Sequence, residues 1–287
     1  MLIRKRVISV LGWGTIVCLL APVLHTVWVS FSPDSFLTPP TTAWSFKWYV
    51  ACFQDRRWMH AILQSLTVAG LAAGLAVATA APAAWSMGNL TRTQQRFVSF
   101  LLLLPALIPP AALGIGLLPL VHVTGLWGTT LGMVLVHATI GLPIGFLIIR
   151  TCLPEQLSEL ETAAAGLGAS RQEILRRVTL PLLAPVLFAA GIAVFVLSLN
   201  ESLVSIFLAT PNNETLPAVV WPQLRYSPSP LVAVASCTTA IIGTLGILIV
   251  LRILVTRGRH SCPSLTKSPP SDRLPACHEI RQVSTVP

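Results

Sequence analysis

Six long apolar segments limit what this chain can fold into. Each has about 20 residues or more, which is the length that an α-helix needs to cross the hydrocarbon core of a bilayer. Of the 287 residues, 54% are hydrophobic and 10% are charged, whereas about a quarter are charged in soluble proteins. We therefore predict an all-α membrane protein. Its six transmembrane helices are expected at about residues 7–30, 62–85, 97–121, 128–149, 182–208 and 230–251.

The positions of the basic residues predict how these helices are oriented. Lysine and arginine gather on the cytoplasmic side of membrane proteins. Fifteen of the 19 lie before the first predicted span, between spans two and three, between spans four and five, or after the sixth. We therefore expect both termini and the segment 150–181 to be cytoplasmic. This asymmetry, with the attraction to anionic headgroups, explains the net charge of +9 and gives no reason to expect nucleic-acid binding.

The composition divides the chain into two parts. Residues 1–256 contain every apolar segment and form the predicted transmembrane domain. Residues 257–287 are polar and rich in proline, serine and threonine, without apolar periodicity. Such a composition buries too little apolar surface to fold by itself. We expect a disordered cytoplasmic tail.

The sequence lacks the patterns that support catalysis or metal binding. Its six cysteines form no Cys-x-x-Cys pair, and Cys262, Cys277 and His278 fall in the proline-rich tail, so no metal site is predicted. The phosphate-binding pattern Gly-x-x-x-x-Gly-Lys-Ser/Thr does not occur either. We expect no catalytic residue and no cofactor in this chain. If ATP drives its function, a partner subunit binds the ATP.

The segment 150–181 is a polar island between apolar segments. Leu157, Leu160, Ala164 and Leu167 recur at steps of three and four residues, which places them on one face of a helix over about 155–167. Gly168 follows directly, and glycine adopts the left-handed conformation that ends many helices. These positions predict a hinge at Gly168.

A second short helix is predicted after this hinge, over about 171–178. Ser170 stands at its N-cap and Glu173 three residues later, which is the spacing of a capping box. Pro181 then opens the next apolar segment. A simple connection between two spans does not require two ordered helices, so we expect this loop to have a function of its own.

This island resembles the "EAA" loop of the permease subunits of bacterial ABC importers. In that family, Glu-Ala-Ala is followed by Gly after three residues and, about a dozen residues later, by Ile-x-Leu-Pro. Here Thr162 takes the place of the Glu, and Glu161 lies one residue earlier. The resemblance assigns contact with an ATPase to Glu161, Thr162, Ala163, Ala164, Gly168, Ala169, Ser170, Leu180 and Pro181.

The resemblance also implies an architecture and a set of partners. The fold would be a bundle like that of type I ABC importer permeases, with six spans and a cytoplasmic loop of coupling helices. The partners would be cytoplasmic ABC ATPases, a second and different permease subunit, an extracytoplasmic solute-binding protein and the lipid bilayer. The location would be the bacterial inner membrane.

A second stretch, residues 196–236, resembles the second permease of spermidine/putrescine-type importers. Those relatives commonly carry Asp-Glu where this chain has Asn200-Glu201. The resemblance favours a small, polyamine-like solute, although related permeases carry other small solutes.

Glu201 is the only side chain of fixed charge within the predicted spans. Ionisable residues inside membranes usually face a cavity or a partner. Asn200 and Glu201 therefore either line the translocation path or lie in the outer interface, and the sequence leaves both open. An ion- or proton-coupled secondary transporter is the alternative function, although such carriers usually show charged relays and inverted repeats.

Overall fold

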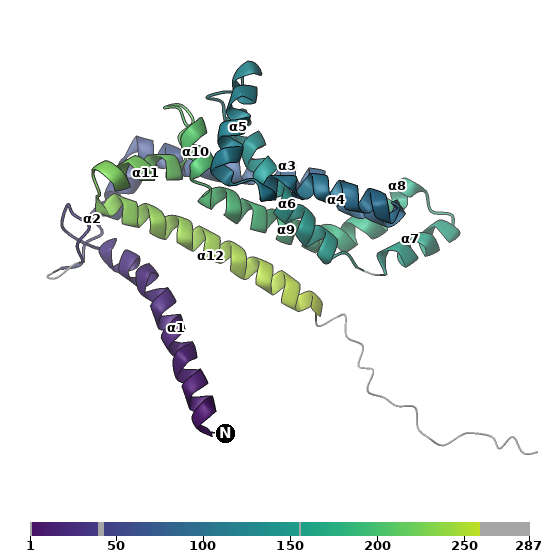
Figure 1. Cartoon of the computed structure of the whole chain (residues 1–287), viewed down its shortest axis with the longest axis horizontal. Helices are drawn as coiled ribbons and strands as arrows, with labels where there is room; N and C mark the ends of the chain where they lie inside the picture. Colours follow the sequence, from purple (N-terminus) through teal and green to yellow (C-terminus); the bar gives the residue numbers. More distant parts are fainter. Residues whose placement is uncertain (1, 40–42, 155, 259–287) are drawn as a thin grey trace, which may run out of the picture.

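The computed structural model describes the backbone of residues 2–39, 43–154 and 156–258. The described residues form α-helices joined by short connections (Figure 1). The helices are α1 (Leu2–Val29), α2 (Lys47–Gln54), α3 (Arg56–Ser86), α4 (Arg92–Leu107), α5 (Pro110–Val123), α6 (Thr130–Thr151), α7 (Leu157–Gly166), α8 (Arg171–Ile174), α9 (Leu180–Asn200), α10 (Leu203–Leu208), α11 (Leu216–Tyr226) and α12 (Pro230–Gly258). A 3₁₀ turn, Met87–Asn89, follows α3, and a π-helical turn, Leu175–Thr179, precedes α9.

Five of the described helices are long and apolar enough to cross a membrane, namely α1, α3, α6, α9 and α12. They confirm the predicted all-α membrane fold and five of the six predicted spans. The predicted disordered tail lies outside the described residues from 259 onward. Its first two positions, 257 and 258, are still part of α12.

The predicted third span, 97–121, is not one straight helix. Two helices, α4 and α5, cover this region and meet at an angle of 101°. The break follows from the Pro109-Pro110 pair, because the residue before a proline is pushed out of the helical conformation. Ile108 accordingly has extended dihedral angles, with φ −96° and ψ 128°. Only the bent pair taken together supplies a sixth span.

The fifth span also differs from its predicted limits of 182 and 208. At one end, α8, the π turn and α9 form one continuous helical rod of 30 residues from Arg171 to Asn200. In the π turn, the N–H of Leu180 bonds to the carbonyl of Leu175, five residues earlier, just before Pro181. At the other end the helix stops at Asn200, because Glu201 is extended and α10 starts anew at Leu203. The second loop helix is therefore continuous with the helix of the fifth span.

The core lies where α3, α6 and α9 pack together. Helix α3 contributes a face of alanines, including Ala72, Ala76 and Ala80, each at most 1% exposed. Gly141 on α6 packs against Val194 on α9 so closely that a Cβ atom at Gly141 would overlap that valine. Small residues thus allow the helix axes to approach closely, as is usual in membrane proteins.

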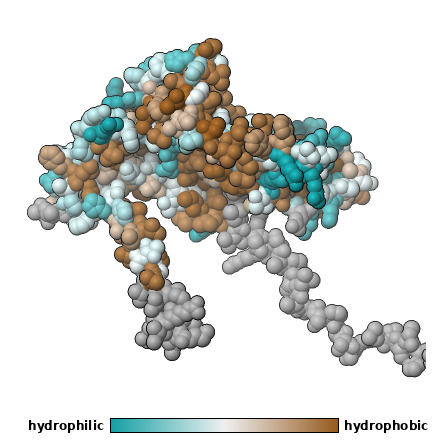
Figure 2. All heavy atoms as spheres, in the orientation of Figure 1, coloured by the Kyte–Doolittle hydropathy of each residue, from teal (hydrophilic) through white to brown (hydrophobic). Residues whose placement is uncertain are grey.

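The arrangement has two distinct ends (Figure 1). Helices α7 and α8 lie at one end of the bundle, and α2, α10 and α11 lie at the other. Helix α12 packs along α9, while α1 projects away from the bundle and is almost fully exposed. Hydrophobic side chains cover the middle of the bundle and hydrophilic ones gather at the end with α7 and α8 (Figure 2).

Candidate functional site

The predicted hinge of the loop is present at Gly168. Its φ angle is +87°, which is the left-handed region that glycine occupies without strain. The N–H of Gly168 donates to the carbonyl of Ala165 at 3.0 Å, and that of Ala169 donates to Ala164 at 3.1 Å. These two bonds are the Schellman motif that closes a helix C-terminus. The chain direction after α7 is therefore fixed by backbone hydrogen bonds.

The predicted cap of the next helix is also present. The N–H of Ser170 donates to Glu173 Oε2 at 3.0 Å, and the N–H of Glu173 donates to Ser170 Oγ at 3.3 Å. Both halves of the capping box are thus formed. With a Schellman motif on one side of the hinge and a capping box on the other, α7 and α8 hold a defined mutual angle.

Glu161 ties this helix pair to the membrane bundle. Its Oε1 accepts a hydrogen bond of 2.5 Å from Thr179 Oγ1 and one of 3.1 Å from Trp85 Nε1. Thr179 lies at the base of α9, and Trp85 lies at the end of α3. The contacts of Glu161 were missed by the sequence reasoning, since neither Trp85 nor Thr179 belongs to the family pattern. By contrast, Thr162 bonds only within α7, to the carbonyl of Ser158.

A hollow of about 340 Å³ lies between the two loop helices. Leu167 lies at its rim and is 89% exposed. Thr162, Ala163, Ser170, Leu180 and Pro181 are exposed outside this hollow. The lining residues are Ala164, Leu167, Gly168, Ala169, Glu173, Ile174, Arg177 and Val178.

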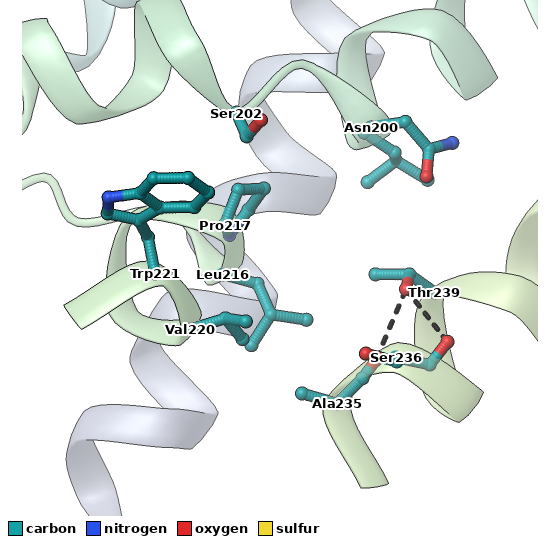
Figure 3. A pocket seen from close by; sticks show the side chains of 10 residues that line it. Asn200, Ser202, Leu216, Pro217, Val220, Trp221, Ala235, Ser236 and Thr239 are labelled. Carbon is teal, nitrogen blue, oxygen red and sulfur yellow. Dashed lines mark hydrogen bonds between the residues drawn. The ribbon is translucent and has the colours of Figure 1, made fainter. Parts of the chain in front are cut away.

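The two residues predicted for the translocation path take different positions at the opposite end of the bundle. Glu201 Oε1 accepts hydrogen bonds from the N–H groups of Leu203, at 3.1 Å, and Val204, at 3.3 Å. Its carboxylate thus caps α10. The Nδ2 atom of Asn200 donates to the carbonyl of Val196 at 2.8 Å. Asn200, but not Glu201, lines a pocket between α9, α11 and α12 (Figure 3).

This pocket, named the outer pocket after the orientation that the basic residues predict, has a volume of about 150 Å³ and a mixed lining. Asn200, Ser202, Ser236 and Thr239 supply polar side chains around it, and Trp221 supplies an aromatic ring (Figure 3). The Thr239 hydroxyl is hydrogen-bonded to the backbone carbonyls of residues 235 and 236. Sequence reasoning found Asn200 and missed Trp221. The remaining walls are Leu199, Leu216, Pro217, Val220 and Ala235.

A buried hydrogen-bond chain lies between this end and the core. His137 on α6 is 2% exposed. Its Nδ1 lies 2.7 Å from Ser198 Oγ on α9, and its Nε2 lies 3.3 Å from Ser205 Oγ on α10. Because Ser205 Oγ donates to the carbonyl of Glu201 at 2.7 Å, it accepts from the N–H at Nε2. With a neutral His137, both ring nitrogens and both serine hydroxyls have a hydrogen-bond partner. The histidine thereby joins α9 to α10, which are separated by the extended residue Glu201. The only sequence signal was a histidine inside a predicted span.

Comparison with known proteins places this architecture in a family. Residues 70–257 match the family described as "Binding-protein-dependent transport system inner membrane component". The chain belongs to that family. It is therefore a permease subunit of an ABC importer and a multi-pass inner-membrane protein, as the EAA-like loop indicated.

Individual relatives agree with this assignment. The permease is 30% identical over 249 residues to the putrescine transport system permease protein PotI of Escherichia coli, covering 82% of this chain and 87% of PotI. It is 27% identical over 242 residues to the spermidine/putrescine permease protein PotC of Haemophilus influenzae, covering 83% and 92%. It is also 29% identical over 207 residues to the trehalose permease protein SugB of Mycobacterium tuberculosis, covering 70% and 75%.

Solved structures show the same fold. A chain of a bacterial ABC transporter involved in the import of the acidic polysaccharide alginate superimposes with a TM-score of 0.61 at 15% identity. That match covers 90% of the permease and 97% of the other chain. A chain of the MetNI methionine ABC transporter matches with a TM-score of 0.50 at 17% identity, covering 70% and 93%. The overall fold is therefore that of an ABC importer permease.

Proposed function

We propose that this permease imports a small polyamine-like solute by a cycle of ATP hydrolysis in partner subunits. The observation that carries the proposal is the continuous helical rod from Arg171 to Asn200. At 1.5 Å per residue this rod is about 45 Å long. One end belongs to the loop helices, and the other end borders the outer pocket. A displacement of the loop is thereby transmitted to the pocket by one rigid element.

The loop is the proposed docking element for a cytoplasmic ABC ATPase. The exposed Leu167 and the hollow behind it offer a projecting apolar side chain and a recess. The hydrogen bonds from Trp85 and Thr179 to Glu161 make the loop move with α3 and α9. To couple ATP hydrolysis to transport, the ATPase must be connected mechanically to helices that can adopt two conformations. Proximity alone transmits no motion. In this proposal both termini and the 150–181 loop are cytoplasmic.

The outer pocket is the proposed contact point for the solute. The Nδ2 atom of Asn200 is held by the carbonyl of Val196, which leaves the Oδ1 atom of Asn200 to accept from a substrate ammonium group. Trp221 offers an aromatic face, and cations are attracted to such faces. The names of the putrescine and spermidine relatives support a cationic solute. A binding protein on this side would deliver it, and a second, different permease subunit would complete the path.

Uptake by the reconstituted importer tests the proposal. The tagged chain is purified with its partner subunits and placed in liposomes with ATP enclosed. We expect ATP-dependent uptake of radiolabelled putrescine, with a KM that rises when Trp221 is changed to alanine. Uptake that needs a proton gradient and not ATP would instead establish a gradient-driven carrier. Transport of trehalose but not putrescine would refute the polyamine assignment.

A matched pair of glycine variants tests the role of the loop. A Cβ atom at Gly168 would be strained because φ is positive, whereas one at Gly166 meets nothing within 4 Å in an ordinary helix. We expect Gly168→Ala to weaken retention of the ATPase subunit and Gly166→Ala to leave retention unchanged. If the hinge is distorted in Gly168→Ala and both variants still retain the ATPase subunit equally, docking at this loop would be refuted.

A further inference from the structure

A basic hollow lies at the same end of the bundle as the loop but outside it. It is about 480 Å³ in volume and is formed by the start of α4 and the end of α6. Three arginines surround it, two from α4 and one from α6. Its lining residues are Arg92, Gln95, Arg96, Ser99, Phe100 and Arg150.

Within the described part of the chain, the arginines of this hollow have no acidic partner. No carboxylate there lines the hollow or forms an ion pair with Arg92, Arg96 or Arg150. Three guanidinium groups around one space repel each other unless an anion lies between them. The guanidinium fork matches the geometry of phosphate oxygens. The hollow thus has the charge and the donors that bind a phosphate group.

Neighbouring contacts hold part of this site in place. Arg150 donates a hydrogen bond to Ser99 Oγ, and its guanidinium lies 5.9 Å from the centre of the Phe146 ring. The side-chain amide of Gln95 donates to the carbonyls of Met87 at 2.8 Å and Leu90 at 3.0 Å. These bonds fix α4 to the turn that precedes it. The arginine on α6 and the two on α4 are therefore held around the same space.

The apolar surface next to the arginines identifies the class of ligand. Arg92, Arg96, Phe100 and Leu104 follow one another at steps of four residues, so they form one stripe along α4. Phe100 is 58% and Leu104 38% exposed, and the neighbouring Phe97 is 67% exposed. From Arg96 to Leu104 the stripe rises about 12 Å. The stripe begins with two arginines and continues as exposed apolar side chains toward the membrane-spanning part of the bundle.

We propose that this hollow binds an anionic phospholipid of the leaflet on the loop side of the membrane. The phosphate lies among Arg92, Arg96 and Arg150, and an acyl chain lies along Phe100 and Leu104. An acidic patch of a partner protein would meet the cations but would leave the apolar stripe bare. Figure 2 agrees with this placement of headgroup and acyl chain, because hydrophilic side chains gather at the end with α7 and α8 and hydrophobic ones cover the middle. That this leaflet is cytoplasmic rests on the proposed function.

Lipid retention by the purified importer tests this site. The complete complex in mild detergent is mixed with dioleoyl phosphatidylglycerol or dioleoyl phosphatidylcholine, and bound lipid is counted by native mass spectrometry. We expect the triple variant Arg92→Gln/Arg96→Gln/Arg150→Gln to bind phosphatidylglycerol at least about tenfold more weakly, since each basic residue contributes to headgroup affinity. Binding of phosphatidylcholine should not change. Unaltered binding of phosphatidylglycerol would overturn the proposal.

A control variant separates this site from general charge attraction. Arg171→Gln/Arg176→Gln/Arg225→Gln removes the same charge from outside the hollow and should keep the bound phosphatidylglycerol. Equal loss of bound phosphatidylglycerol in both triple variants would overturn the proposal. It would also be overturned if the Arg92/Arg96/Arg150 variant lost the ATPase subunit but kept its lipid binding. Inorganic phosphate is added in a second series. Displacement of the lipid by inorganic phosphate at millimolar concentration would identify a site for the free anion and overturn the lipid assignment.

Photolabelling of the unaltered protein guards against a variant that does not fold. Phosphatidylglycerol with a diazirine in its acyl chain should label the peptide that contains residues 97–104. Labelling elsewhere but not there would overturn the proposal. Neither measurement uses ATP or solute. Failure of ATP-driven uptake and failure of lipid binding are therefore separate results.

Discussion

The hydroxyl of Thr179 donates a hydrogen bond of 2.5 Å to the carboxylate of Glu161, 18 residues earlier in the chain. This bond joins the first loop helix, α7, to the base of α9. Thr179 is 1% exposed, so the bond is shielded on its threonine side from competing water. Trp85 at the end of α3 donates to the same oxygen atom. One carboxylate therefore holds the loop against two spanning helices.

Replacement of Thr179 by valine should loosen α7 while keeping the shape of the side chain. Hydrogen bonds to charged groups contribute about 1.5–3 kcal/mol, so we expect a lower melting temperature in detergent and faster amide hydrogen exchange over residues 157–166. Thr162→Val is the matched control, because Thr162 bonds only to the carbonyl of Ser158 within α7. Similar exchange in the two variants would show that the bond does not hold the loop.

Gly141→Ala should destabilise the core. The new methyl group would overlap Val194 on α9, and overpacking typically costs about 1–3 kcal/mol. Gly70→Ala is the control, because a Cβ atom at Gly70 meets nothing within 4 Å. We expect a lower melting temperature for Gly141→Ala alone and recovery when Val194→Ala is added. Without any recovery, the close approach of α6 to α9 at this point would be refuted.

His137→Ala should destabilise the protein, because the buried hydroxyl of Ser198 loses its acceptor, while that of Ser205 keeps its bond to the carbonyl of Glu201. An unsatisfied buried group costs about 1–3 kcal/mol. His60→Ala is the control, since His60 is exposed on α3. In a double-mutant cycle with Ser198→Ala we expect a coupling energy of about 0.5–3 kcal/mol. Strict additivity of the two changes would contradict the hydrogen-bond chain.

Cys52 should resist alkylation in the folded protein. The side chain is 0% exposed on α2, and burial raises the pKa of its thiol from 9.0 to about 11. Only the thiolate reacts, and raising the pKa lowers the thiolate fraction at every pH below 11. We expect a maleimide at pH 8 to modify the exposed Cys152 quickly and Cys52 only after denaturation. Rapid modification of Cys52 in the native protein would refute this packing of α2.

The same pKa shift predicts a loss of stability in alkaline solution. The folded state keeps the thiol proton between pH 9 and about 11, whereas the unfolded state releases it there. The contribution of Cys52 to stability is therefore complete below pH 9 and falls as pH rises through about 11. In Cys52→Ala the stability should fall less steeply as the pH rises. Melting temperatures measured from pH 8 to 11 for the variant and the unaltered protein would show the difference.

Local rules predicted the loop in detail. Gly168 has the left-handed φ angle expected of it, and Ser170 with Glu173 forms the expected capping box. These features depend on neighbours in the sequence, which a single chain displays. The contacts of Glu161 with Trp85 and Thr179 join distant segments. No local pattern encodes them, so the structure was needed to find them.

The breaks inside two of the predicted spans have a common cause. Hydropathy over 97–121 and 182–208 continues across both breaks, so apolar runs alone do not locate them. The breaks come from backbone chemistry: Pro109 and Pro110 exclude the helical conformation before them, and Glu201 offers its carboxylate to the N–H groups that begin α10. The sequence left both roles of Asn200 and Glu201 open. In the structure Glu201 caps a helix and Asn200 reaches the pocket.

The most direct test of the account is the number of solute molecules imported per ATP hydrolysed by the reconstituted complex. Glu161→Ala removes the acceptor that Thr179 and Trp85 share, whereas Glu159→Ala changes an exposed residue of the same helix. We expect both variants to keep the ATPase subunit and only Glu161→Ala to hydrolyse ATP with little import. Equal import per ATP in Glu161→Ala, Glu159→Ala and the unaltered protein would contradict this expectation.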